Sequence, residues 1–208
     1  MAADYAVAQQ VADHLLEATL IDGGPKEAIL QTLATRASRL VDAWFGKPEG
    51  YWKAEDTASI RYYNGSGCDE LWPDEMAAAP TEVAVSEDGI LTTYTVWAST
   101  DYILYPLNAL AEGRPYRYLK IDPMNGTKLY FFKYPKSVKI TSKWGYALVT
   151  PGPIEEAVIV QASRWYKRGQ QAFQDAGAVT ELMQMRYLKK IDPEVELILG
   201  KMPGGITI

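Results

Sequence analysis

The sequence predicts an α+β fold, a small helical bundle of about four helices with an inserted antiparallel β-rich region. Amphipathic helical patterns occupy the first 50 residues and recur after residue 150, whereas short apolar runs separated by turn residues lie between them. We therefore divide the chain into an N-terminal helical pair of the core at 1–50, a β-rich insertion at 51–150, and C-terminal helices with a tail at 151–208. At 208 residues and 48% hydrophobic content, the chain can bury a core without a disulfide or a metal.

Two helices are expected in the N-terminal part. Apolar residues recur at helical spacing from Asp4 to Leu20, and Asp4 is a suitable N-cap. Gly23-Gly24-Pro25 breaks this pattern. A second apolar stripe, which begins at Ile29 and includes Trp44, follows and ends at Gly46. The short connection predicts an antiparallel helix pair.

The middle of the chain is expected to form strands. The candidate strands are residues 60–63, 83–85, 91–97, 118–121, 129–132 and 138–144. The turn signals between them are Asn64-Gly65, Asp88-Gly89 and Asn125-Gly126. Strands at this spacing predict a small antiparallel sheet or sandwich.

Two further helices are expected after Thr150-Pro151-Gly152-Pro153. The third helix carries an apolar stripe from Ile154 to Phe173 and ends at Gly177. Residues 179–191 fit a strand or a helix equally well. Asp192 and Pro193 then suit the N-cap and first position of a last helix, which ends at Gly200.

The residue types that could carry catalysis or bind a metal are too few and too scattered to predict an enzyme or a cofactor. The single histidine, His14, shares a helix face with Glu17, but the pattern supplies no further metal ligands. The single cysteine, Cys68, has no nucleophile signature around it. Gly65-Ser66-Gly67 lacks the third glycine and the helix of a phosphate-binding loop, so we interpret it as a hairpin turn.

No membrane partner is expected. No run approaches the roughly 18 consecutive apolar residues of a membrane span. The N-terminal segment also lacks the basic start of a signal peptide, since its first basic residue is Lys26.

Charge is distributed unevenly along the β-rich region. Residues 62–113 contain nine acids and no base, whereas residues 114–143 contain eight bases and one acid. One interpretation is that acidic and basic strands lie beside each other in one sheet. A second is that an acidic face of one subunit meets a basic face of the next, which closes into a ring when the rotation fits. A third is a nucleic-acid-binding β module that uses the basic, aromatic stretch 114–143.

Of the two functional interpretations we favour the ring, because the whole chain carries a net charge of -5. The candidate subunit-interface residues are Asp69, Glu70, Asp74, Glu75, Lys133, Lys136, Lys139 and Lys143.

Short phrases along the chain resemble a known family, and they occur in that family's order. They are RASRLVD at 36–42, RYYNGSG at 61–67, DYILYPLN at 101–108, WGY at 144–146 and IDPEV at 191–195. Together they are similar to the head-to-tail connector (adaptor) proteins of tailed bacteriophages.

The resemblance implies a structural protein of the virion neck, made in the cytoplasm of the bacterial host. It implies a ring, commonly of twelve subunits, that lies beneath the portal protein, continues the channel for the genomic DNA and docks other neck or tail-completion proteins. In such proteins the C-terminal segment engages the portal. The corresponding residues here are Met202, Pro203, Ile206 and Ile208, in an apolar tail with no core to join.

Overall fold

The structure is a computed structural model that describes residues 3–16, 23–174 and 191–202. The chain folds as two compact units. A helical unit takes its residues from Met1–Gly50 and Thr150–Ile208, and a β unit consists of Tyr51–Val149. The predicted α+β fold, with a β region inserted into a helical bundle, is confirmed.

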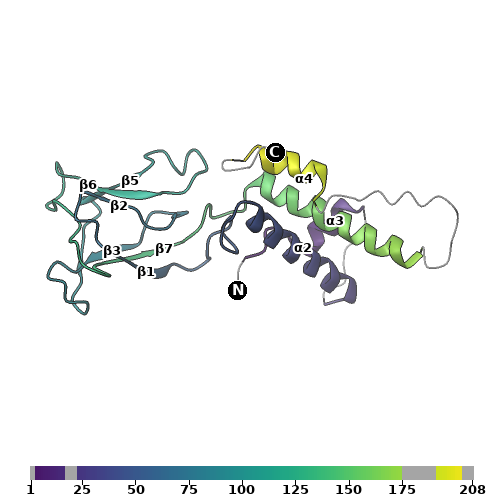
Figure 1. Ribbon diagram of the computed structural model, residues 1–208, viewed down its shortest axis with the longest axis horizontal. Helices are drawn as coiled ribbons and strands as arrows, with labels where there is room; N and C mark the ends of the chain where they lie inside the picture. The colour runs from purple at the N-terminus through teal and green to yellow at the C-terminus, as the bar shows by residue number, and fades with distance from the viewer. Residues whose placement is uncertain (1–2, 17–22, 175–190, 203–208) are drawn as a thin grey trace. The chain divides into compact units, whose positions relative to one another are not determined.

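The described part of the helical unit contains four helices. They are α1 (Ala8–His14), α2 (Pro25–Trp44), α3 (Gly152–Gln174) and α4 (Pro193–Gly200). Helix α2 packs against α1 and α3, and α3 also contacts α1 and α4. Figure 1 shows α3 beside both α2 and α4. The buried side chains at these contacts include Leu30, Val41, Ile154, Val158 and Leu199.

Helix α1 is shorter than the helix predicted from Asp4 to Leu20. It begins at Ala8, because the N–H of Val7 donates to Oε1 of Gln10 at 2.8 Å and so closes the first turn. It ends at His14. Residues 17–20 of the predicted helix lie outside the described residues.

Asp4 is therefore not an N-cap, and that prediction was wrong. Its carboxylate accepts hydrogen bonds from Nε2 of Gln31 at 2.9 Å and from Oγ1 of Thr35 at 2.7 Å. It also lies 3.5 Å from the guanidinium of Arg39. These contacts tie the segment before α1 to α2, and only the packed helices bring these groups together.

The predicted start of the last helix is confirmed. Oδ1 of Asp192 accepts a hydrogen bond from the N–H of Glu194 at 2.9 Å, and Pro193 is the first helical residue. The predicted apolar stripe of α3 is buried at its start, from Ile154 onwards. Ile29 of α2 is 53% exposed, contrary to the predicted stripe. The predicted helix end at Gly177 and the segment 179–190 lie outside the described residues.

The β unit contains two antiparallel sheets. The four-stranded sheet has the order β1 (Ser59–Tyr63), β7 (Val138–Ser142), β3 (Glu82–Val85) and β4 (Thr95–Val96). The three-stranded sheet has the order β2 (Glu70–Leu71), β6 (Tyr118–Ile121) and β5 (Tyr102–Tyr105).

The two sheets pack face to face around one apolar core. The core residues are Leu71, Met76, Val83, Val85, Trp97, Leu119, Ile121, Phe131, Val138, Ile140 and Trp144. Because side chains alternate along each strand, the inner faces of both sheets supply this core and the outer faces point in opposite directions. Figure 1 shows β2, β5 and β6 on one side of the β unit and β1, β3 and β7 on the other.

The predicted strands 60–63, 83–85, 118–121 and 138–144 are confirmed as β1, β3, β6 and β7. The predicted strand 91–97 reduces to β4, and β2 and β5 were missed. Residues 129–132 form no strand. Phe131 in this segment is fully buried and its N–H donates to the carbonyl of Cys68 at 2.9 Å, so the segment is held by side-chain burial and isolated hydrogen bonds.

Asn64-Gly65 is not a hairpin turn, because β1 pairs with β7 and not with the next strand along the chain. The N–H of Gly65 lies 3.2 Å from the carbonyl oxygen of Tyr134 and 3.0 Å from Oγ of Ser137. A Cβ at position 65 would lie 1.7 Å from the carbonyl oxygen of Phe132. Glycine is required here by the close approach of two backbone segments.

Candidate assembly surfaces

The histidine and the cysteine singled out in the sequence lie in different units of the structure. No group of three or more His, Cys, Asp or Glu side chains among the described residues is placed to hold a metal ion. His14 is the last residue of α1 in the helical unit, and Cys68 is an exposed thiol in the β unit. Within the same described ranges, no helix has both the length and the apolarity of a membrane span.

The outer face of the three-stranded sheet carries stacked aromatic rings. Leu119 and Ile121 of β6 point into the core, so Tyr118 and Lys120 point outward. Tyr118 stacks on Tyr105 of β5 at a centroid distance of 4.9 Å and 3° between the planes.

The stack extends across all three strands. The other side of Tyr118 packs on Trp72, which directly follows β2, at 4.3 Å and 23°. Trp72 is nevertheless 64% exposed. We call this surface the Trp72 face, consisting of Trp72, Tyr105, Tyr118, Ile103, Asp69, Glu70 and Lys120.

The Trp72 face carries more acidic than basic groups. Nζ of Lys120 lies 2.9 Å from Oε1 of Glu70 and 3.4 Å from Oδ2 of Asp69. These two hydrogen-bonded carboxylates raise the pKa of Lys120. One ammonium thus faces two carboxylates, and the face retains negative charge.

The predicted interface acids Asp74 and Glu75 are held in contacts within the β unit. Asp74 accepts hydrogen bonds from Arg61 at 2.7 Å and from the hydroxyl of Tyr63 at 2.9 Å. Glu75 pairs with Arg117 at 3.4 Å and accepts a hydrogen bond from the hydroxyl of Tyr51. Burial, and then the hydrogen bond to Glu75, raise the pKa of Tyr51.

The outer face of the four-stranded sheet is apolar at both edges. The strand register aligns Tyr62, Lys139, Ala84 and Val96 in one row across all four strands. Tyr62 and Val96 are 52% and 61% exposed, and Ile60, two residues before Tyr62, is 51% exposed.

A second tyrosine extends this surface beyond the strands. The ring of Tyr94 lies 6.2 Å from that of Tyr62, and its hydroxyl donates to the carbonyl oxygen of Lys136 at 2.8 Å. We call the surface the Tyr62 face, consisting of Ile60, Tyr62, Tyr94, Val96, Thr141, Glu82, Lys136, Lys139 and Lys143.

The Tyr62 face carries more basic than acidic groups. Nζ of Lys139 lies 2.8 Å from Oε1 of Glu82, and this hydrogen bond raises the pKa of Lys139. Lys143 continues the outward alternation of β7. Neither Lys136 nor Lys143 forms an ion pair with any residue that the structure describes.

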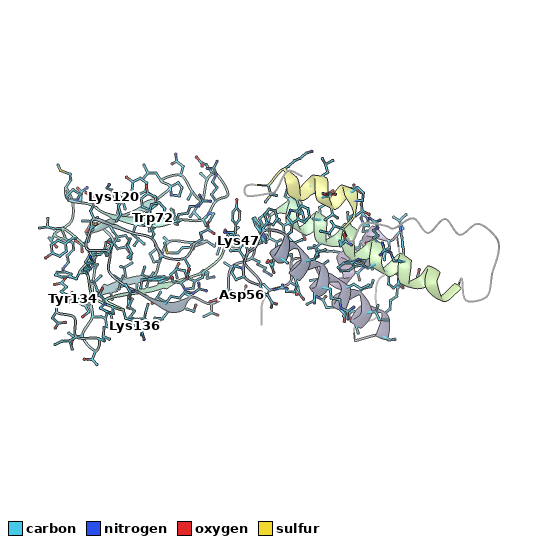
Figure 2. All side chains as sticks on the ribbon, viewed as in Figure 1. Lys47, Asp56, Trp72, Lys120, Tyr134 and Lys136 are labelled. Carbon is cyan, nitrogen blue, oxygen red and sulfur yellow. The ribbon has the colours of Figure 1, made fainter. Side chains whose placement is uncertain are left out.

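The structure thus distributes the candidate interface residues between opposite sides of the β unit. Asp69 and Glu70 lie on the Trp72 face, and Lys136, Lys139 and Lys143 lie on the Tyr62 face. Figure 2 shows Trp72 and Lys120 on one side of the β unit and Lys136 on the other. The side chain of Lys133 packs over Gly67, where a Cβ would lie 3.3 Å from it.

Acidic and basic strands also neutralise each other within each sheet, as one interpretation of the sequence proposed. Five of the eight bases in the stretch 114–143 form ion pairs inside the β unit. These bases are Arg114, Arg117, Lys120, Lys128 and Lys139. The stretch supplies strands to both sheets, so its bases do not form one continuous surface.

The sequence did not reveal which aromatic residues form these two faces. The available signal was composition, with 14 Tyr and 6 Trp against 4 Phe. Tyr and Trp suit interfaces as well as cores, and strand pairing decides between these roles. Of the predicted portal-docking residues, Met202 is half-buried, and Pro203, Ile206 and Ile208 lie outside the described residues.

Solved structures similar to the chain include two from gene transfer agent particles. One is described as the neck of an empty gene transfer agent particle computed with C6 symmetry, with 18% identity, coverage of 77% of this chain and 76% of that chain, and a TM-score of 0.46. The other is described as the virion of a native gene transfer agent particle, with 15% identity, 77% coverage of both chains and a TM-score of 0.43. No protein-family model and no curated protein matches the chain.

Proposed function

We propose that the protein is a structural head-to-tail adaptor of a tailed-phage virion. It forms a ring beneath the portal, continues the DNA channel and docks neck or tail proteins, without catalysis. The observation that carries this proposal is the pair of exposed aromatic faces on opposite sides of one sandwich. The ordered connector-like phrases of the sequence support the same function.

Large exposed aromatic faces are unfavourable in water and mark interaction sites. Trp and Tyr dominate the binding energy of protein interfaces because they bury large areas and lose little conformational entropy. Trp72 and Tyr62 remain more than half exposed in the isolated chain. A subunit of a ring needs two different surfaces, one for each neighbour, and the β unit offers two.

The proposed partners follow from this function. They are the portal protein, other neck or tail-completion proteins, further copies of the chain in a ring of twelve, and the genomic DNA that passes through the channel. The portal contact is assigned to the tail residues Met202, Pro203, Ile206 and Ile208. The ion pairs within the β unit do not favour the nucleic-acid-binding alternative, because they engage five of the eight bases in the stretch.

Cryo-electron microscopy of the neck of a virion that contains this protein tests the function directly. Density for twelve copies of the chain, directly beneath the portal and around the channel, is the expected result. A neck in which the chain is found nowhere below the portal overturns the proposal. Mass measurement of the purified protein with its portal gives an independent check, since a stable complex is expected.

A further inference from the structure

We propose that the Trp72 face of one subunit docks on the Tyr62 face of the next subunit. This inference rests on the proposed ring and names the surfaces that close it. The partner is a second copy of this chain, and each copy uses one face for each neighbour.

Geometry favours unlike faces over like faces. The two sheets share one core, so the two outer faces point in opposite directions. A subunit that binds through opposite sides propagates head to tail and closes into a ring when the rotation per subunit fits. Contact through two copies of one face alone would stop at a dimer and leave the other face in water.

Charge gives a second, independent reason. On the Trp72 face, Lys120 balances only one of the two carboxylates of Asp69 and Glu70. On the Tyr62 face, Glu82 balances Lys139, whereas Lys136 and Lys143 have no ion-pair partner among the described residues. Unlike faces bring opposite residual charges together, and like faces bring like charges together, which is unfavourable.

Preorganisation gives a third reason. Trp72 is fixed by its stack on Tyr118, which is fixed in turn by Tyr105. Tyr62 is held beside Tyr94, whose hydroxyl is anchored to the backbone at Lys136. Side chains that are already ordered lose little further entropy on binding, so their exposed area contributes to affinity.

Thiol cross-linking tests which faces meet. The lone thiol is first removed by Cys68→Ser. In this background Ile103→Cys places a thiol on the Trp72 face, and Thr141→Cys places one on the Tyr62 face. Met124→Cys, at an exposed turn outside both faces, is the matched control. Each variant is treated with a short bis-maleimide at high protein concentration and analysed by denaturing electrophoresis.

The double variant Ile103→Cys/Thr141→Cys is expected to give a ladder of dimers, trimers and larger products. A mixture of the two single variants should give dimers only, and each single variant should stay monomeric, as should the control. Dimers from either single variant alone overturn the inference, because they show that like faces meet. A double variant that cross-links no better than Met124→Cys also overturns it.

A second variant tests the contribution of Trp72 to the contact. Trp72→Ala, added to the Ile103→Cys partner of the mixture, should lower the dimer yield at least about tenfold, as loss of a central aromatic contact does. Circular dichroism of this variant should match that of the parent. An undiminished yield contradicts the assignment of Trp72 to the contact.

This result is independent of the test of function. If the chain lies beneath the portal but the ladder does not form, the subunit contact is wrong and the adaptor function stands. If the ladder forms but the chain is missing from the neck, the contact stands and the adaptor function is wrong.

Discussion

Gly65 provides the sharpest test of the packing inside the β unit. It is buried, and a Cβ at this position would lie 1.7 Å from the carbonyl oxygen and 2.7 Å from the carbonyl carbon of Phe132. The atoms in the way belong to the backbone of Phe132, so they cannot rotate aside as a side chain would. Gly65→Ala must push two backbone segments apart.

The expected cost has two parts. Forcing extra volume into a packed interior costs about 1–3 kcal/mol. Moving the segments apart also weakens the hydrogen bonds that the Gly65 N–H makes with Tyr134 and Ser137, and leaving a buried N–H unsatisfied costs about 1–3 kcal/mol. We therefore expect Gly65→Ala to lower the free energy of unfolding of the β unit by about 2–6 kcal/mol, the sum of the two parts.

Gly113→Ala is the matched control in the same unit. Gly113 has a φ of +64° and nothing within 4 Å of the added Cβ, so its replacement introduces backbone strain without a clash. Such strain costs about 1–2 kcal/mol. Native-state hydrogen exchange of the β1 and β7 amides measures both costs within the β unit. If Gly113→Ala proves as costly as Gly65→Ala, the reasoning from the close approach is refuted.

Three further predictions concern the tail, the ring and the helical unit. Ile206→Asp/Ile208→Asp should abolish the complex with the portal in mass photometry, whereas the control Thr207→Ser should leave it intact. If both variants bind the portal equally well, the assignment of the tail to portal docking is contradicted. Raising salt from about 0.1 M to 1 M shortens the Debye length from about 10 Å to about 3 Å, so ring formation in sedimentation experiments should weaken. Lys143→Glu should impair ring formation at low salt. If assembly is insensitive to salt and to this substitution, the charge pattern serves only pairing within the sheets. Burial raises the pKa of Asp42 above its ordinary value of 3.8, so the folded state holds this proton more tightly than the unfolded state does. The contribution of Asp42 to the free energy of unfolding should therefore fall as the pH rises from 3.8 to the pKa of the folded state, and it should stay level above that pKa. Subtraction of the Asp42→Asn stability curve from that of the parent measures this contribution, and a difference that grows with pH in that window contradicts the prediction.

Much of the helical unit could be predicted from local sequence signals. Pro25 after two glycines marks the start of α2, and Asp192-Pro193 marks the start of α4. An N-cap and a first-turn proline act within one turn of chain, so neighbouring residues suffice to recognise them. Asp4 looked equally suitable, but its partners are Gln31 and Thr35, which only helix packing brings close.

Some strands could likewise be recognised from local sequence, whereas others depend on strand pairing. The alternation at Val138–Ser142 was legible because one side of β7 is buried and the other is not. Strand β5 has no such contrast, since all four of its residues are half-buried. The two-residue strand β2 exists only because β6 pairs with it. Short strands depend on their neighbours more than on their own residues.

The sequence alone determined the fold class, the run of acids followed by bases, and the wealth of Tyr and Trp over Phe. Only the tertiary structure decided that Trp72 and Tyr62 lie on opposite outer faces and that Lys120 and Lys139 meet acids of neighbouring strands. The physical reason is the two-residue period of a strand. A shift of one residue in register exchanges the buried and exposed faces, and register is set by pairing between segments far apart in the chain.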